Sequence, residues 1–188
     1  MTRYLAALTI LLLLGTVLTR VVLLRRAGTN AMHFGNLDKT DFLIPPLALF
    51  YFYTIFAAAL GWPLVSAQRF FQSEVVGWIG VVVCFAGLLI LLLSLISFGK
   101  SFRVGIDVDQ PDDLVTTGVF SFSRNPIYLG FGLVLIGQFL VFPNWIPLAY
   151  LGAGIWLFHR QVLREEKFMR EKYGHEYAEY CSRVRRYI

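Results

Sequence analysis

The sequence predicts an all-α integral membrane protein: a helical bundle with five transmembrane helices, forming a single membrane domain of residues 1–188. Of its 188 residues, 57% are hydrophobic and only 15% are charged, against about 45–50% and about 25% in an average soluble domain. The mean hydropathy is +0.63. A chain of this size has too much surface for its volume to bury so many apolar residues in water. The composition therefore excludes an ordinary soluble domain, a disordered chain and a nucleic-acid-binding module.

Three stretches are apolar over the length that crosses a bilayer, which is about 20 residues. They are predicted as helices over residues 4–24, 42–62 and 75–98. The first stretch also has the basic flank of a signal peptide. No clear small-residue cleavage site follows it, however, and Arg25 with Arg26 is typical of a stop-transfer flank. We therefore expect the first stretch to be a membrane helix.

The fourth apolar region, residues 125–158, is interrupted near its middle. Pro143 with Asn144, and then Pro147, divide it into helices predicted over 126–142 and 145–158. At 1.5 Å per residue each helix is about 21–26 Å long, which is shorter than a hydrocarbon core about 30 Å thick. We predict a short helical hairpin packed against the other three helices. A re-entrant hairpin buried in protein is the alternative.

Basic residues lie mostly on one side of this predicted topology. With five spans, the loops after the first and third spans lie on the same side as the C-terminus. That side carries Arg25, Arg26, Lys39, Lys100, Arg103, Arg124 and the eight basic residues from Arg160 to Arg186. The other side carries only Arg3 and Arg69. The positive-inside rule then predicts an outside N-terminus and a cytoplasmic C-terminus, in the cytoplasmic membrane of a prokaryote or the endoplasmic reticulum of a eukaryote.

Two polar segments, residues 99–124 and 159–188, remain for chemistry with a polar cofactor. Both flank the hairpin, so we expect them to meet in space as a cytoplasmic loop and an amphipathic C-terminal helix. The helix is predicted from the spacing i, i+4, i+7 and i+11 of Tyr173, Tyr177, Tyr180 and Val184. A helix lying on the bilayer surface is one interpretation of this pattern. It does not explain Glu165 and Glu166, which an anionic lipid surface would repel.

Candidate metal ligands are present but not in a metal-binding pattern. The loop contains Asp107, Asp109, Asp112 and Asp113. These residues lack the spacing and the terminal Glu of an EF-hand. The three histidines are scattered, and the chain has no CxxC or HExxH motif. The sequence therefore predicts no metal site.

The start of the fourth predicted helix has features of an anion site. Asn125 precedes Pro126, which is a normal helix start. The free amides of a helix N-terminus can also hold an anion such as a ligand carboxylate. Arg124, which directly precedes Asn125, adds a guanidinium group that can pair with such an anion through two hydrogen bonds.

Three motifs follow one another in the second half of the chain. They are residues 113–120 (DLVTTGVF), residues 124–130 (RNPIYLG), and Glu165-Glu166 followed by the tyrosine-rich residues 173–180. In this order and spacing they resemble the isoprenylcysteine carboxyl methyltransferase family, over about Gly99 to Arg186. Asn125 replaces the usual histidine of that family, which excludes a histidine base at this position. Phe120 replaces its usual tyrosine, and Asp112 stands where many relatives have histidine.

The resemblance implies that residues 99–186 bind S-adenosylmethionine and release S-adenosylhomocysteine. The implied cofactor-binding residues are Asp112, Asp113, Leu114, Val115, Gly118, Phe120, Asn125, Pro126, Ile127, Tyr128 and Glu165. Glu165 would bind the ammonium or ribose hydroxyls, and Asn125 with the neighbouring amides would bind the carboxylate. Leu114, Val115, Gly118 and Phe120 would line the adenine. The implied catalytic residues are Arg160 and Glu166. Arg160 would hold the acceptor, although a snorkelling helix-end arginine is an equal interpretation.

The implied reaction is methylation of the C-terminal carboxylate of an isoprenylated cysteine, or of a similar lipophilic carboxylate. Because an α-carboxyl has a pKa of about 3.5, such an acceptor is already ionised at neutral pH and needs no general base. One alternative is a phospholipid or other small-lipid methyltransferase. Another is a non-enzymatic membrane subunit, although spans two to five lack the intramembrane charges of many carriers. The expected partners are the prenylated substrate and membrane lipid, with no nucleic acid and no metal.

Overall fold

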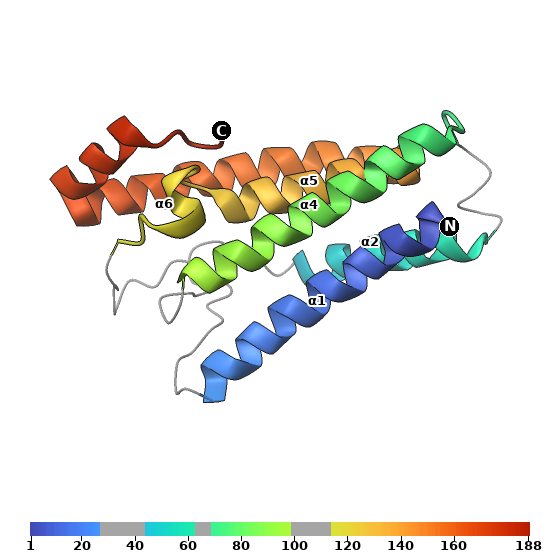
Figure 1. Cartoon of the computed structure of the whole chain (residues 1–188), viewed down its shortest axis with the longest axis horizontal. Coiled ribbons are helices and arrows are strands. Elements are labelled where there is room, and N and C mark those ends of the chain that lie inside the picture. The colour runs from blue at the N-terminus through green and yellow to red at the C-terminus, as the bar shows by residue number, and fades with distance from the viewer. Residues whose placement is uncertain (27–43, 63–68, 99–113) are drawn as a thin grey trace.

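A computed structural model describes residues 1–26, 44–62, 69–98 and 114–188, and these residues contain helices and no β-strand. The elements are α1 (Thr2–Arg26), α2 (Ile44–Leu60), α4 (Glu74–Phe98), the 3-10 turn η3 (Gly118–Ser121), α5 (Pro126–Val141) and α6 (Trp145–Arg183). Helices α4, α5 and α6 lie side by side along the longest axis, and α1 and α2 cover one side of them (Figure 1). The all-α prediction is confirmed for the described residues.

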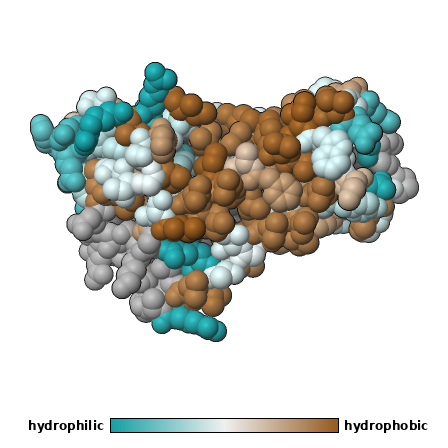
Figure 2. Space-filling view, in the orientation of Figure 1, coloured by the Kyte–Doolittle hydropathy of each residue, from teal (hydrophilic) through white to brown (hydrophobic). Residues whose placement is uncertain are grey.

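Within the described residues, two helices are long and apolar enough to cross a membrane, α1 over Thr2–Leu23 and α4 over Glu74–Phe98. The apolar parts of α2 and α5 are shorter. Figure 2 shows apolar residues across the middle of the molecule and hydrophilic residues toward both ends. The predicted helices over 4–24, 42–62 and 75–98 are observed to within a few residues. The count of five spans stays a prediction.

Helices α4 and α5 pack in close backbone contact through paired glycines. A Cβ atom added to Gly80 would lie 2.7 Å from the carbonyl oxygen of Gly137, and one added to Gly87 would lie 2.6 Å from that of Gly130. The pairing is antiparallel, because the residue number rises along α4 as it falls along α5. Small residues at such positions let two helix backbones approach closely.

A polar contact joins α1 to α5 inside the apolar core. The amide of Gln138, which is fully buried, donates to the carbonyl of Ala6 at 2.7 Å and to Thr9 Oγ1 at 3.0 Å. The buried apolar core of these helices includes Ile10 of α1 and Ile55 of α2. Hydrogen bonds of this kind hold helices together where water is excluded.

Helix α6 corrects the predicted organisation of the last third of the chain. The prediction had a short helix ending at Phe158 and a separate tail helix, but one helix runs from Trp145 into the tail. Between residues 159 and 173 the chain has no Pro or Gly and is rich in strong helix formers, so leaving the apolar region does not end the helix. The first break comes at Gly174, whose φ of 48° and ψ of −113° are not helical.

The chain turns back beyond Gly174. Tyr177 and Tyr180 are buried, so this part of the tyrosine stripe packs against protein, and the interpretation as a bilayer-surface helix is wrong there. The following residues, 184–188, which we call the return segment, run back over α6 (Figure 1). There the hydroxyl of Tyr187 hydrogen-bonds His159 Nδ1 at 2.9 Å.

Candidate functional site

The predicted site residues that meet in space do so where α5 begins. Pro126 occupies the first turn of α5, and Asn125 stands at the N-cap position without making a side-chain cap. The side-chain nitrogen of Asn125, Nδ2, instead donates to Glu166 Oε1 at 3.4 Å and to the carbonyl of Arg186 at 3.1 Å. The first-turn amides of α5, including that of Ile127, are therefore not capped by Asn125. Uncapped amides at a helix N-terminus favour a negatively charged partner.

Glu165 of α6 faces Tyr128 of α5. Its Oε1 accepts hydrogen bonds from the Tyr128 hydroxyl at 2.5 Å and from Gln161 Nε2 at 3.0 Å. Burial raises the pKa of the Glu165 carboxyl above its ordinary value, and these two hydrogen bonds only partly oppose the rise. Within the described residues both bonds go to Oε1, so Oε2 is the atom of this carboxylate that a ligand would contact.

Glu166 is the centre of a buried ion-pair network. Its carboxylate accepts from Arg124 Nη2 at 3.1 Å and from Arg186 Nη2 at 2.8 Å. Arg186 Nε adds contacts of 3.1 Å to both carboxylate oxygens. Burial alone would raise the pKa of Glu166, but the hydrogen bonds from Arg186 and the charge of Arg124 lower it below the ordinary value. Glu166 is therefore ionised at neutral pH and held by protein groups.

The return segment completes this network through its backbone. The carbonyl of Arg185 accepts from the Arg124 amide at 3.0 Å. The carbonyl of Arg186 accepts from Ser123 Oγ at 3.4 Å, in addition to its bond from Asn125. The chain just before α5 is thus bonded to residues about 60 positions later in the sequence.

Two residues predicted to contact the cofactor, Phe120 and Ile127, have side chains that pack into the fold. Phe120 is only 4% exposed, its ring meets Phe98 edge-on at 4.6 Å, and its carbonyl accepts from the Tyr180 hydroxyl at 2.6 Å. The side chain of Ile127 packs against both core clusters of the bundle, which leaves its amide for the site.

The remaining predicted adenine-lining residues lie just before or within η3. Gly118 has a φ of 64°, and a Cβ atom there would clash with Ser97 Oγ, so this position requires glycine. Leu114 and Val115 are half-buried in the segment that leads into η3. Asp112 and Asp113 lie outside the described residues.

Arg160 is not brought together with the two glutamates. It precedes them by five and six residues, which is about 140° and about 240° around an ideal helix. Its guanidinium carbon lies 5.7 Å from the ring centre of Trp156, and that tryptophan is exposed on the side of α6. This placement groups Arg160 with the apolar surface rather than with Glu165.

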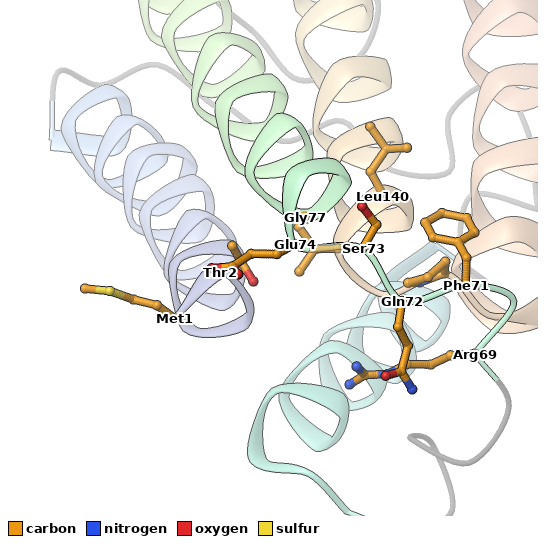
Figure 3. Close-up of a pocket in the computed structure, with 11 residues that line it drawn as sticks. Met1, Thr2, Arg69, Phe71, Gln72, Ser73, Glu74, Gly77 and Leu140 are labelled. Carbon is orange, nitrogen blue, oxygen red and sulfur yellow. The ribbon is translucent and has the colours of Figure 1, made fainter.

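The cavity drawn in Figure 3 is a separate feature at the far end of the bundle. It has a volume of about 360 Å³ and lies where α1 and α4 begin and α5 ends, with Thr2, Glu74 and Leu140 among its lining residues. The 16 residues of α5 put this end about 24 Å from Asn125. Among the predicted site residues that the structure describes, none lines this cavity.

Sequence reasoning missed Arg186 and the return segment. Arg186 belongs to a run of basic residues that a membrane surface would also explain. The available signal was Gly174, an isolated glycine in a helical pattern, which marks a place where a helix can end and the chain can turn.

Residues 75–176, more than half of the chain, match the model of the phospholipid methyltransferase family. The chain belongs to this family. Its curated relatives confirm the resemblance to isoprenylcysteine carboxyl methyltransferases. The "Probable protein-S-isoprenylcysteine O-methyltransferase" of Oryza sativa subsp. indica is 30% identical over 112 residues, covering 58% of this chain and 59% of the relative. The protein-S-isoprenylcysteine O-methyltransferase of Saccharomyces cerevisiae is 33% identical over 109 residues, covering 56% of this chain and 46% of the yeast protein.

A solved structure shares the fold of this phospholipid methyltransferase family member. It is described as the eukaryotic intramembrane Ras methyltransferase ICMT, and it matches with a TM-score of 0.62 at 20% identity over 88% of this chain and 58% of that chain. The present chain thus spans about half to three-fifths of the length of the relatives it matches.

Proposed function

We propose that this protein is an S-adenosylmethionine-dependent methyltransferase that modifies a lipophilic acceptor at the membrane surface. The observation that carries the proposal is the meeting of Glu165 and Tyr128 beside the uncapped first turn of α5. The family to which the chain belongs and the names of its curated relatives support the same activity.

The residues at this end of the bundle fit such a cofactor by their chemistry. The Glu165 carboxylate suits an ammonium or ribose hydroxyls, because charge-assisted hydrogen bonds are the strong ones. The first-turn amides of Ile127 and Tyr128 suit a carboxylate. Leu114, Val115 and Gly118 remain the residues we propose for the adenine, with Asp112 and Asp113 nearby in sequence.

When bound, S-adenosylmethionine supplies an electrophilic methyl group on a sulfonium. The protein's part is to bind, to orient and to exclude water, which are the main contributions to a reaction between an ionised acceptor and a preformed electrophile. Glu165 and the α5 amides would fix the two ends of the amino-acid moiety. Asn125 and Pro126 would hold the start of α5 in the required position.

For the acceptor we propose the C-terminal carboxylate of an isoprenylated cysteine. Arg160 lies at the edge of the apolar surface beside Trp156, where a guanidinium can pair with a carboxylate whose lipid chain remains in the bilayer. Glu166 was predicted to be catalytic, but its oxygens bond to Arg124, Asn125 and Arg186. We therefore propose a positioning role for Glu166.

Calorimetric titration of detergent-solubilised protein with S-adenosylhomocysteine tests the cofactor site. We expect saturable binding by the wild type and a dissociation constant at least about ten-fold higher in Glu165→Gln, because a hydrogen bond to a charged group is lost. Glu171→Gln is the matched control, since Glu171 lies about one and two-thirds turns later on α6 with its side chain 66% exposed. Absence of binding by folded wild-type protein would rule out the methyltransferase proposal.

A phospholipid amine is a second candidate acceptor, favoured by the description of the family model. An amine must lose a proton before it attacks, so it needs a nearby base. Competition for methyl transfer between a farnesylated cysteine and phosphatidylethanolamine separates the two candidates. Methylation of the lipid alone would contradict the carboxylate proposal.

A further inference from the structure

Arg186 is anchored by both its side chain and its backbone. Its guanidinium bonds both oxygens of Glu166, at 3.1 Å and 2.8 Å, while its carbonyl accepts from Asn125 Nδ2 at 3.1 Å. Its neighbour Tyr187 bonds His159 on α6 at 2.9 Å. His159 and Glu166 are seven residues apart on α6, so the return segment lies along about 10 Å of that helix.

This network differs from an ordinary surface ion pair. The nearby pair of Arg183 and Glu179 has a separation of 3.7 Å with side chains 66% and 58% exposed, and pairs of this kind contribute little. The side chain of Glu166 is only 5% exposed and that of Arg186 is 35% exposed. Removing Arg186 would leave the buried Glu166 carboxylate with Arg124 as its remaining cationic partner among the described residues, and weakening a buried ion pair in this way is costly. The return segment is therefore fixed specifically at Glu166, the residue that follows Glu165 on α6.

We infer that the return segment is a strap over the cofactor site and that Arg186 is its positioning residue. Arg186 aligns Glu166 and Asn125, which together define the start of α5 where the cofactor carboxylate would bind. The strap must open for cofactor exchange, so the Arg186–Glu166 contact governs how fast a bound cofactor leaves. This inference rests on the proposed function.

The release rate of S-adenosylhomocysteine from the purified full chain tests the inference directly. We expect Arg186→Ala to release the bound ligand at least about ten-fold faster, because charged hydrogen bonds close the strap. Arg186→Lys keeps the charge but not the forked geometry, so we expect an intermediate rate. Arg183→Ala is the matched control and should release at the wild-type rate. In methyl-transfer assays Arg186→Ala should raise the KM for S-adenosylmethionine more than it lowers kcat.

A double-mutant cycle identifies the contact responsible. In a Glu166→Gln background, Arg186→Ala should change the release rate by no more than about two-fold, since the shared interaction is already weakened. If the fold-change in release rate of the double mutant instead equals the product of the two single-mutant fold-changes, Arg186 acts through a group other than Glu166. That result would contradict the assigned role.

A covalent link that holds the strap closed gives an independent test, because it should slow ligand release where Arg186→Ala speeds it. In a Cys181→Ser background, His159→Cys with Tyr187→Cys can be joined by a short bifunctional maleimide after the ligand is loaded. We expect release to become slower than in the untreated double variant. Equal release rates with and without the link, together with equal rates in Arg186→Lys, Arg186→Ala and Arg183→Ala, would overturn the strap while leaving the cofactor site intact. A wild type that binds no S-adenosylhomocysteine would overturn both.

Discussion

Glu165 and Glu166 are adjacent in sequence but have opposite electrostatic environments. Glu165 is bonded by neutral Tyr128 and Gln161, and its burial raises its pKa. Glu166 is bonded by two arginines, and its pKa is lowered. Neighbouring carboxyls with diverging pKa values commonly have different roles. Here Glu165 is available to a cationic ligand, while Glu166 holds the protein together around it.

The raised pKa of Glu165 predicts a pH dependence of ligand binding. As the pH falls through this pKa, above the ordinary value of 4.5, the carboxyl takes up a proton and loses its attraction for an ammonium group. We therefore expect S-adenosylhomocysteine to bind progressively more weakly as the pH is lowered over a range that spans this raised pKa. Titration calorimetry across this range measures the change. Glu165→Gln should show a flatter profile, and parallel profiles in the two proteins would contradict the prediction.

The lowered pKa of Glu166 predicts a contribution to folding stability. A carboxyl whose folded-state pKa is depressed stabilises the fold above its unfolded pKa, and this stabilisation is lost as the pH falls through the folded value. At neutral pH we expect Glu166→Ala to destabilise the protein by about 3 kcal/mol, because two arginines lose their partner. Thermal unfolding in detergent without ligand measures this. Glu171→Ala should stay near the wild type, since the Lys167–Glu171 pair is exposed.

Sequence reasoning predicted that some of the site residues lie close together, but it did not indicate how others pack. It placed Glu165, Asn125 and Tyr128 in one site, because their motifs lie at two helix positions that a hairpin brings together. It placed Phe120 at the adenine, and the structure packs the Phe120 ring against Phe98 of α4 while its carbonyl accepts from Tyr180. An apolar residue in a motif gives no sign, from type and spacing alone, of whether it faces a ligand or the core.

At the level of helices, the glycine pairs make α4 and α5 one closely packed unit. The first-turn residues of α5 therefore take their position from α4 as well as from the chain before them. Mutations at this interface should alter the candidate site by displacing the first-turn residues of α5.

Gly137→Ala tests this packing. A Cβ atom at this position would lie 2.5 Å from the backbone oxygen of Gly80, which neither backbone can accommodate without a shift. We expect a destabilisation of about 1–3 kcal/mol, measured by thermal unfolding. Gly132→Ala in the same helix is the control, because nothing lies within 4 Å of its added Cβ atom. That variant should equal or slightly exceed the wild type in stability, and equal losses in both would contradict the packing argument.

Helix boundaries were predicted well only where apolar runs begin and end at turns. The ends of α1, α2 and α4 follow the apolar runs to within a few residues. The end of α6 does not, because the change from apolar to charged residues near Phe158 marks a change of surroundings and not of backbone conformation. The return segment was missed because its partners lie about 60 residues away.

For the whole molecule, the distribution of basic residues predicts which end faces the cytoplasm. Ser73 lies just before α4 and Ser121 lies in η3, so they mark opposite ends of the bundle, and both are exposed. In a background lacking Cys84 and Cys181, we expect Ser73→Cys to react with an impermeant maleimide on intact cells. Ser121→Cys should react only after permeabilisation, because the positive-inside rule places its end inside. The reverse pattern would contradict the proposed orientation.

Helix α6 runs without a break from the apolar surface at Trp156 to the carboxylate at Glu165, nine residues later, or about 14 Å along its axis. With the Trp156 end in the bilayer, as proposed, this rigid helix holds Glu165 at a constant distance from the membrane. The distance of the reactive centre from the bilayer is therefore fixed, and it cannot adjust to acceptors that extend farther from the membrane or less far. Acceptors would then be sorted by the length of the link between their lipid anchor and their reactive atom, whatever the shape of the polar group that carries it.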